Sequence, residues 1–428
     1  MTRYLRLKRL ALLVLVGSVS ATLWAQTPAA GLAPERIAVI DRALQRYVDD
    51  NTVAGMVALA LRDGRPVYEK AFGWSDKEAG QRMTTDTMFR IASQTKALTS
   101  VAVMQLVEEG KIALSTRVGT LIPTFASTTV AETDSKGGVR TVPATRAITV
   151  RDLLTHTAGI SYGTDPSVAA LYQAKGLGPA AGFGWYTADK DEPICATMER
   201  LGTLPFVTQP GEAWVYGYNT DVLGCLVEKA SGQPLDAYIR DHITTPLGLK
   251  DTQFFLSPAQ RDRLAAVYAS GQGGGALQRA PDGARGQGAY VEGPRKSFAG
   301  GAGMLSTARD YARFLDALRL GDTLDGVRIL GPQSVKLMST NQVGTLHSTN
   351  GLGFGLGFET TDRFGASGMS SEGSFGWGGA YGTFYRVDPE QRLVLVLMLQ
   401  LIPNSTDVRE VFPTLIYQAL HTASEPPR

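Results

Sequence analysis

Hydrophobic periodicity near the start of the chain predicts a helix, a hairpin and a second helix. Over residues 36–48 the apolar side chains recur every three or four positions, which is the spacing of one helix face. Two short apolar runs at 56–61 and 66–72 flank Asp63-Gly64, a dipeptide typical of tight turns, so these runs are expected to form a β-hairpin. Apolar periodicity returns at 93–109 and predicts the second helix.

The C-terminal part of the chain predicts three more strands and a closing helix. Short apolar runs at 354–359, 382–387 and 393–399 are typical of strands, and residues 408–420 have helical spacing. The predicted strands are joined by hairpins more than by crossovers, so the sheet should be largely antiparallel. We therefore expect an α/β (α+β) fold in which N- and C-terminal strands share one sheet flanked by helices.

The middle of the chain predicts an insertion into that sheet domain. Residues 111–299 contain helical patches and loops, including a polar insertion at 127–146 and a Gly-rich stretch at 271–288. Residues 30–110 and 300–428 would then form one discontinuous sheet domain, interrupted by a mainly helical one. No internal repeat is visible.

Residues 1–25 have the pattern of a secretory signal peptide. Four basic residues precede a short apolar run and a small-residue exit, and the run is too short to span a bilayer. We expect export to the periplasm or the medium and no stable membrane insertion after cleavage; an uncleaved N-terminal anchor is the alternative. Without this segment the chain has 38 basic and 40 acidic residues, so its charge gives no basis for nucleic-acid binding.

Cysteine and histidine are too scarce to predict a metal site. The chain has 2 Cys and 4 His in 428 residues, and no His-Glu-x-x-His motif. Cys195 and Cys225 could pair in an oxidising compartment, but their spacing does not decide whether they lie close enough. No metal and no organic cofactor is expected.

The segment with the clearest chemistry is Ser93-Gln94-Thr95-Lys96, at the start of the second predicted helix. Ser93 and Lys96 are three residues apart, so their side chains project from the same face. A serine hydroxyl needs a base to become a nucleophile, and a desolvated lysine can share that work. A Ser-x-x-Lys match arises by chance about once in a chain of this length, so its context must decide.

Two further segments give that context: 210–224, which contains Tyr216-Gly217-Tyr218-Asn219, and 375–383, which contains Trp377-Gly378-Gly379-Ala380. Together with Ser93 and Lys96, they resemble serine hydrolases related to class C β-lactamases and penicillin-binding DD-peptidases. Within that superfamily the chain is most similar to the β-lactamase-like (family VIII) carboxylesterases. The resemblance covers nearly the whole mature chain and implies the β-lactamase/DD-peptidase fold.

The resemblance assigns roles to individual residues. Ser93 matches the acylated serine, Lys96 the lysine one turn later, and Tyr216 the tyrosine that relays protons. The backbone N–H groups of Ser93 and Ala380 would form the oxyanion hole. These roles imply an acyl-enzyme on Ser93, with water releasing the acyl group.

Departures from the β-lactamase pattern point to the substrate. Tyr218 stands where the motif has Asn, and Trp377 stands where β-lactamases have Lys. Loss of that lysine removes a partner for a substrate carboxylate, and an aromatic wall suits neutral or apolar esters. The expected substrate-binding residues are Trp377, Gly378, Gly379, Tyr218 and Tyr381. Trp377 could instead be sheet core, and Tyr381 could face solvent.

Several alternatives stay open. The chain could be a class C-like β-lactamase, a D-amino-acid peptidase, or an acyltransferase using the same acyl-enzyme; a non-catalytic cell-wall-binding homologue is the alternative outside enzymes. Ser161 lies in a Gly-x-Ser-x-Gly segment, but no strand precedes it and Pro166 follows, so a loop residue is expected. His156 is expected to have a capping or turn role rather than a catalytic one. The sequence does not give the acyl-chain preference or the oligomeric state.

Overall fold

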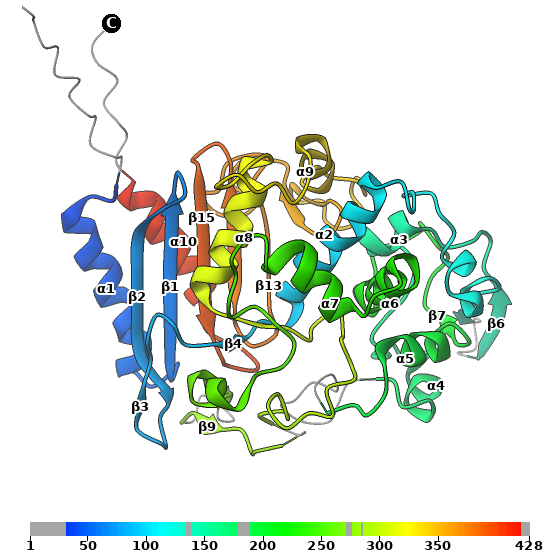
Figure 1. The fold of residues 1–428 in the computed structure, drawn as a ribbon, viewed down its shortest axis with the longest axis horizontal. Coiled ribbons are helices and arrows are strands. Elements are labelled where there is room, and N and C mark those ends of the chain that lie inside the picture. Colours follow the sequence, from blue (N-terminus) through cyan, green and yellow to red (C-terminus); the bar gives the residue numbers. More distant parts are fainter. Residues whose placement is uncertain (1–30, 134–137, 179–188, 271–275, 284–285, 421–428) are drawn as a thin grey trace, which may run out of the picture.

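The computed structural model describes residues 31–420 apart from 134–137, 179–188, 271–275 and 284–285. The predicted signal peptide, 1–25, lies outside these residues, as does part of the Gly-rich stretch. Figure 1 shows one large sheet at one end of the molecule and a cluster of short helices at the other.

The large sheet has eight strands, and every pair of neighbours is antiparallel. The strands, in spatial order, are β11 (Leu352–Phe354), β12 (Glu359–Thr361), β13 (Phe375–Gly378), β14 (Phe384–Asp388), β15 (Leu393–Leu399), β1 (Gly55–Arg62), β2 (Arg65–Asp76) and β3 (Gln81–Arg82). N-terminal and C-terminal strands therefore meet in one sheet, where β1 pairs with β15 and Met56 lies opposite Leu399. This confirms the predicted fold class.

Helices cover both faces of this sheet. Along β1, Met56 and Ala58 point into a core shared with helices α1 (Pro34–Asp49) and α10 (Val408–Ala419). Val57 and Leu59 point the other way, toward α2 (Thr95–Glu108) and α8 (Ala308–Leu320). Because successive side chains of a strand alternate between faces, a strand with both faces covered must be apolar; β15 is apolar throughout, and β1 is apolar up to its last residue, Arg62.

The remaining elements are short and lie between or beside the large ones. The helices are α3 (Val150–Leu154), α4 (Ala169–Ala174), α5 (Ile194–Leu201), α6 (Asn219–Ser231), α7 (Leu235–Ile239) and α9 (Pro332–Met338). The small sheets pair β4 (Phe89–Arg90) with β10 (Leu305–Ser306), β5 (Thr129–Thr133) with β6 (Val139–Pro143) and β7 (Pro205–Phe206), and β8 (Tyr268–Ala269) with β9 (Gln278–Arg279).

Two predictions of local structure were wrong. Residues 354–359 were predicted as one strand, but 355–358 form the turn between β11 and β12, where Gly357 has a φ of 96°, in the left-handed region that favours glycine. The polar insertion at 127–146 contains the β5–β6 pair, whose strands expose most of their polar side chains. Apolar content alone predicted the wrong local structure in both segments. Turn geometry determines the structure of the first segment, and pairing between the two strands of a hairpin determines that of the second.

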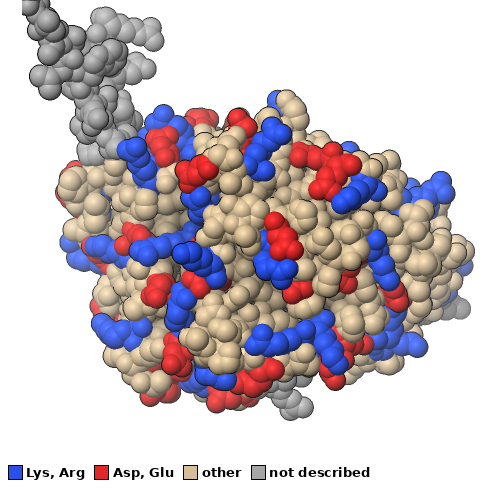
Figure 2. Space-filling view, in the orientation of Figure 1, with Lys and Arg blue, Asp and Glu red and all other residues tan. Residues whose placement is uncertain are grey.

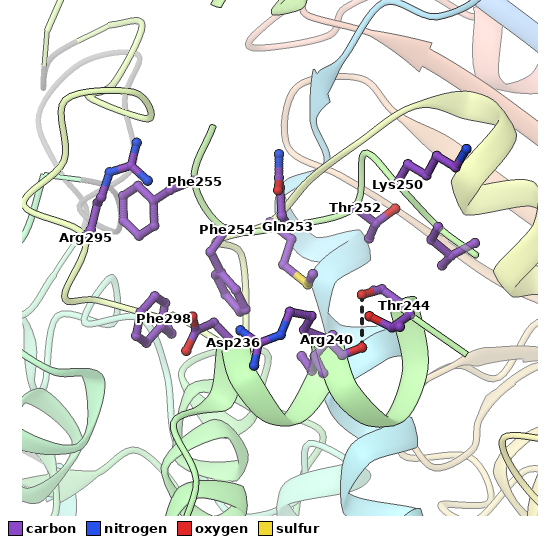
Figure 3. Close-up of a pocket in the computed structure, with 14 residues that line it drawn as sticks. Asp236, Arg240, Thr244, Lys250, Thr252, Gln253, Phe254, Phe255, Arg295 and Phe298 are labelled. Carbon is purple, nitrogen blue, oxygen red and sulfur yellow. Dashed lines mark hydrogen bonds between the residues drawn. The ribbon is translucent and has the colours of Figure 1, made fainter. Parts of the chain in front are cut away.

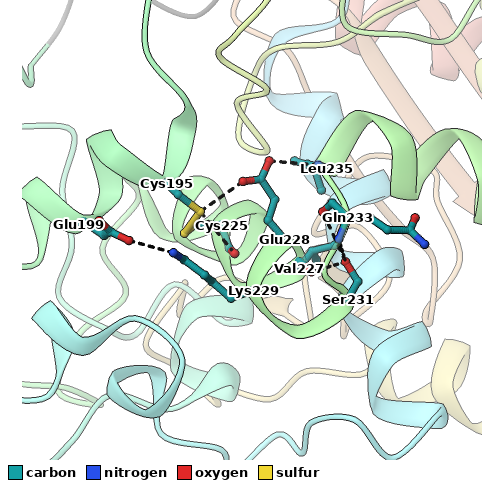
Figure 4. The surroundings of a disulfide bond; sticks show 9 residues. All are labelled: Cys195, Glu199, Cys225, Val227, Glu228, Lys229, Ser231, Gln233 and Leu235. Atoms are coloured by element: carbon teal, nitrogen blue, oxygen red, sulfur yellow. Dashed lines mark hydrogen bonds and ion pairs between the residues drawn. A yellow bond between two sulfur atoms is a disulfide. The ribbon is translucent and has the colours of Figure 1, made fainter.

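A disulfide joins the helical cluster. Cys195 of α5 and Cys225 of α6 are bonded, with their Cα atoms 4.8 Å apart, which settles the pairing that the sequence left open. Figure 4 shows an ion pair beside it between the same two helices, from Lys229 to Glu199 at 3.0 Å. The two helices are therefore fixed to each other both covalently and by charge.

On the face in Figure 2, basic and acidic side chains are interspersed. Within the described part of the chain, no helix is long and apolar enough to cross a bilayer. Across the same residues, no group of three or more His, Cys, Asp or Glu side chains is placed to hold a metal ion.

Candidate active site

Ser93 lies in a tight turn that leads from β4 into α2. The turn is a 3-10 helix, Ala92–Gln94, and Thr95 begins the α-helix, so Ser93 and Lys96 face the same side. Ala92 has a φ of 43°, a left-handed conformation that costs a residue with a Cβ about 1–2 kcal/mol. Such strain directly before a reactive side chain is common at functional sites. Ser93 remains partly exposed while Lys96 is buried.

Lys96 makes three polar contacts that match the three hydrogens of an ammonium group. Its Nζ lies 2.7 Å from the carbonyl oxygen of Gly301, 3.0 Å from Tyr162 Oη and 3.3 Å from Ser93 Oγ. In the described part of the chain, no carboxylate forms an ion pair with Lys96. A buried cation is thus held by neutral oxygens, one of them the candidate nucleophile.

Tyr216 closes the other side of this group. Lys96 Nζ lies 4.7 Å from the centre of the Tyr216 ring, and Trp377 Nε1 donates a hydrogen bond of 3.2 Å to Tyr216 Oη. Trp214 stacks on the ring at 5.7 Å, with the two planes 14° apart. The structure therefore brings Ser93, Lys96 and Tyr216 together, with Tyr216 Oη fixed by a donor that replaces the lysine of β-lactamases.

Tyr162 is a site residue that the sequence did not predict. It lies next to Ser161 in the Gly-x-Ser-x-Gly segment, and burial raises the pKa of its phenol well above the usual value. Its hydroxyl is therefore neutral and accepts from Lys96. Ser161 itself is 5% exposed and accepts the N–H of Gly163 within a loop, as expected for a residue that is not at a strand-to-helix turn.

The end of β13 lies against the Ser93 turn. Gly379 packs so closely that a Cβ there would lie 2.4 Å from the carbonyl oxygen of Ile91, and Ala380 packs with Ala92. Among the described residues, the N–H of Ala380 has no hydrogen-bond acceptor. The geometry thus leaves a backbone donor beside Ser93, where an oxyanion hole requires one.

The five predicted substrate-binding residues divide into two groups. Trp377 and Gly378 are partly exposed, with Trp377 beside Tyr216, whereas Gly379 is buried against the Ser93 turn. Tyr218 and Tyr381 are each 1% exposed, which leaves no free surface for a substrate, so their assignment needs correction. Tyr218 Oη instead accepts the N–H of Gly178, and Tyr381 packs in a small apolar cluster.

His156 lies in a turn, as expected, and this turn is close to the site. It follows α3 with a φ of 56°, and Asn219 Nδ2 lies 3.0 Å from its Nδ1. Burial lowers the pKa of His156 well below its usual value, so the ring is neutral where it packs against Tyr216. Asn219 also donates to the carbonyl oxygens of Ile160 and Val215, which ties the loops carrying Tyr162 and Tyr216 together.

A separate cavity of about 490 Å³ lies beside α7, and its lining includes none of the site residues above. Figure 3 shows Phe254, Phe255 and Phe298 on one side of it and Lys250 at the other end. It has no nucleophile or base placed as at Ser93, so the chemistry is assigned to the Ser93 turn.

The fold and the site together define a serine hydrolase. A serine lies beside a buried lysine at the start of a helix, a tyrosine faces them, and an antiparallel sheet lies behind. The comparisons with known proteins agree. The β-lactamase family profile matches residues 40–415, and the chain belongs to this family.

Two sequence relatives and one solved structure illustrate its range. Protein Rv1367c of Mycobacterium tuberculosis is 35% identical over 84% of this chain and 89% of its own length. Esterase EstB of Burkholderia gladioli is 33% identical over 86% of this chain and 91% of its own. The structure of EstCE1, a hydrolase with promiscuous acyltransferase activity, superposes with a TM-score of 0.74 at 26% identity, covering 90% of this chain and 98% of that one.

Proposed function

We propose that this serine hydrolase cleaves carboxylic esters through an acyl-enzyme on Ser93. The observation that carries this proposal is the hydrogen bond from Trp377 to Tyr216. The indole of Trp377 stands where β-lactamases have a lysine. Tyr216 therefore still has a hydrogen-bond donor beside it, but the substrate no longer meets a cation at this position. An aromatic surface without that cation favours neutral esters over carboxylate-bearing lactams or peptides. The similarity to esterase EstB supports the same substrate class.

Acylation uses the contacts around Ser93. Tyr216, acting as a phenolate beside the Lys96 ammonium group, takes the proton of Ser93 Oγ as Oγ bonds to the ester carbonyl carbon, and the carbonyl oxygen becomes an anion. The N–H groups of Ser93 and Ala380 stabilise that anion, each by about 3–4 kcal/mol. When the carbonyl re-forms, the bond to the alcohol oxygen breaks, and the alcohol leaves with the proton held by Tyr216.

Deacylation repeats the sequence with water. Tyr216 takes a proton from the water as its oxygen bonds to the acyl carbon, and the same backbone donors hold the second oxyanion. The bond to Ser93 Oγ then breaks, Oγ regains a proton, and the carboxylic acid leaves. We further propose that the protein acts outside the cytoplasm, which the pattern of residues 1–25 supports.

An acyltransferase is the second candidate. EstCE1, which shares the fold along most of its length, is described as a hydrolase with promiscuous acyltransferase activity. An alcohol that enters in place of water would be acylated by the same steps, because its hydroxyl can give a proton to Tyr216 as water does.

The decisive experiment compares the mature protein with Ser93→Ala on p-nitrophenyl butyrate and on a chromogenic cephalosporin. We expect ester turnover that falls at least 1,000-fold in the variant, and little cephalosporin cleavage by either protein. Ser161→Ala is the matched control, because Ser161 is the serine of the competing motif, and it should retain ester turnover. Faster cleavage of the cephalosporin than of the ester, or ester turnover that survives Ser93→Ala, would contradict the proposal.

A further inference from the structure

Asp221 is linked to Lys96 by hydrogen bonds through a single residue, Gly301. It lies in the first turn of α6, is 2% exposed, and accepts the N–H of Gly301 at 3.0 Å through Oδ1. The carbonyl oxygen of the same Gly301 accepts from Lys96 Nζ at 2.7 Å. A carboxylate, one backbone residue and the site lysine therefore form a continuous chain of hydrogen bonds.

The segment around Gly301 is held tightly between α2 and α6. A Cβ on Gly301 would lie 2.4 Å from Asp221 Oδ2, so only glycine allows this approach. On the other side, Thr99 Oγ1 donates to the carbonyl oxygen of Gly300 at 2.9 Å, and Thr95 Oγ1 accepts the N–H of Met304 at 3.0 Å. Any displacement of Asp221 would move the oxygen that holds Lys96.

The charges of Asp221 and Lys96 also balance each other. Both side chains are 2% exposed, and among the described residues neither forms an ion pair at 4.0 Å or less. Burial raises the pKa of Asp221 to about 6, opposed by the attraction of Lys96 and by the Gly301 N–H. The other charged or titratable groups that act on Asp221 are Lys190 and the neutral Tyr162.

A buried carboxylate without a direct ion pair stabilises a fold poorly, so its presence here calls for a functional explanation. We propose that Asp221 is a positioning residue for ester hydrolysis: its carboxylate fixes Gly301, and thereby Lys96 Nζ, against Ser93 Oγ, and supplies the negative charge that balances Lys96. This inference rests on the proposed function. Protonation of Asp221 removes both effects, so kcat should fall on the acid side of about pH 6.

The test measures kcat and KM for p-nitrophenyl butyrate from pH 4.5 to 9 in the wild type and in Asp221→Asn, which keeps the shape and removes the charge. We expect an acid limb near pH 6 in the wild-type kcat profile. In Asp221→Asn, kcat at pH 8 should fall at least tenfold with KM within threefold, and the limb near pH 6 should disappear. A Tm that is unchanged or higher would show that the loss is not one of folding.

Two variants serve as comparisons. Asp310→Asn alters another carboxyl whose pKa is raised by burial and which accepts a backbone N–H, away from Lys96; both kcat and the acid limb should persist. Thr99→Val removes the hydroxyl that holds Gly300 but no charge, so kcat should fall while the limb stays. If Asp221→Asn does not fold, Thr99→Val and the wild-type profile still decide.

Three results would overturn the inference: a wild-type kcat without a limb between pH 5 and 7, an Asp221→Asn enzyme with wild-type kcat and profile, or the same loss in Asp310→Asn. Absence of ester turnover by the wild type would instead contradict the proposed function. In that case the rate at which a fluorophosphonate labels Ser93 tests Asp221 directly, since labelling measures activation of the serine without an ester. Equal labelling of wild type and Asp221→Asn would also overturn the inference.

Discussion

The hydrogen bond from Trp377 to Tyr216 can be tested by Trp377→Phe, which keeps an aromatic ring but removes the only donor of the indole. A net hydrogen bond between neutral groups is worth about 1 kcal/mol, and one to an ionised partner about 1.5–3 kcal/mol. Only the difference favours catalysis, because the donor must stabilise the ionised form of Tyr216, which takes the proton, over the neutral phenol. The N–O distance of 3.2 Å is at the long end of the normal range, so we take the lower part of that difference, about 0.5–1 kcal/mol.

That difference corresponds to a fall in kcat of about 2- to 5-fold. Trp214→Phe is the matched control: Trp214 packs on the same Tyr216 ring, but its Nε1 has no hydrogen-bond partner among the described residues. Steady-state kinetics on p-nitrophenyl butyrate should therefore show a larger loss of kcat in Trp377→Phe than in Trp214→Phe. Equal losses of kcat in the two variants, or a change in Trp377→Phe confined to KM, would show that Trp377 acts only by filling space.

Two further predictions concern Tyr162 and the disulfide. Tyr162→Phe removes one acceptor from Lys96 and should lower kcat about 10- to 100-fold. The control is Tyr172→Phe, which alters another buried tyrosine whose hydroxyl has no partner among the described residues, and its kcat should stay within twofold of the wild type. Equal kcat for both variants would exclude a role for the Tyr162 hydroxyl. The Cys195–Cys225 bond closes a loop with a sequence separation of 30, which stabilises the fold by about 3.5 kcal/mol. The double variant Cys195→Ala/Cys225→Ala should therefore have a Tm about 4 °C lower in calorimetry. An unchanged Tm would contradict the bond.

The sequence predicted best the elements whose own residues determine them. The strand at 393–399 has the bounds of β15, because a run of seven apolar residues can only be buried on both faces. The helix predicted at 408–420 matches α10 to within one residue for a similar reason. Ser93 and Lys96 were found because three-residue spacing on a helix guarantees that they are neighbours.

What the sequence did not predict depends on packing between distant segments. Tyr162 meets Lys96 from 66 residues away, through a loop whose position is set by Asn219 and its acceptors. Tyr218 was assigned to the pocket because it stands where the motif has Asn, and Tyr381 because it follows the Trp377 segment. Tyr218 instead precedes α6 as its N-cap and Tyr381 lies in a turn, and both side chains are buried. The turn at 355–358 was misassigned because its apolar residues are buried without belonging to a strand.

The pairing of β1 with β15 has a consequence for how the chain folds. β1 lies near the N-terminus and is synthesised early, but one of its two neighbours in the sheet is β15, which ends at residue 399. The hydrogen bonds between β1 and β15 therefore cannot form until almost the whole chain has been synthesised. Contacts this distant in sequence carry a large loop-closure entropy and slow folding. A nascent chain that ends before β15 exposes an apolar edge on β1, the kind of edge that binds other strands. The enzyme should therefore depend on chaperones for most of its synthesis, and truncation before residue 393 should give insoluble protein rather than a smaller active domain.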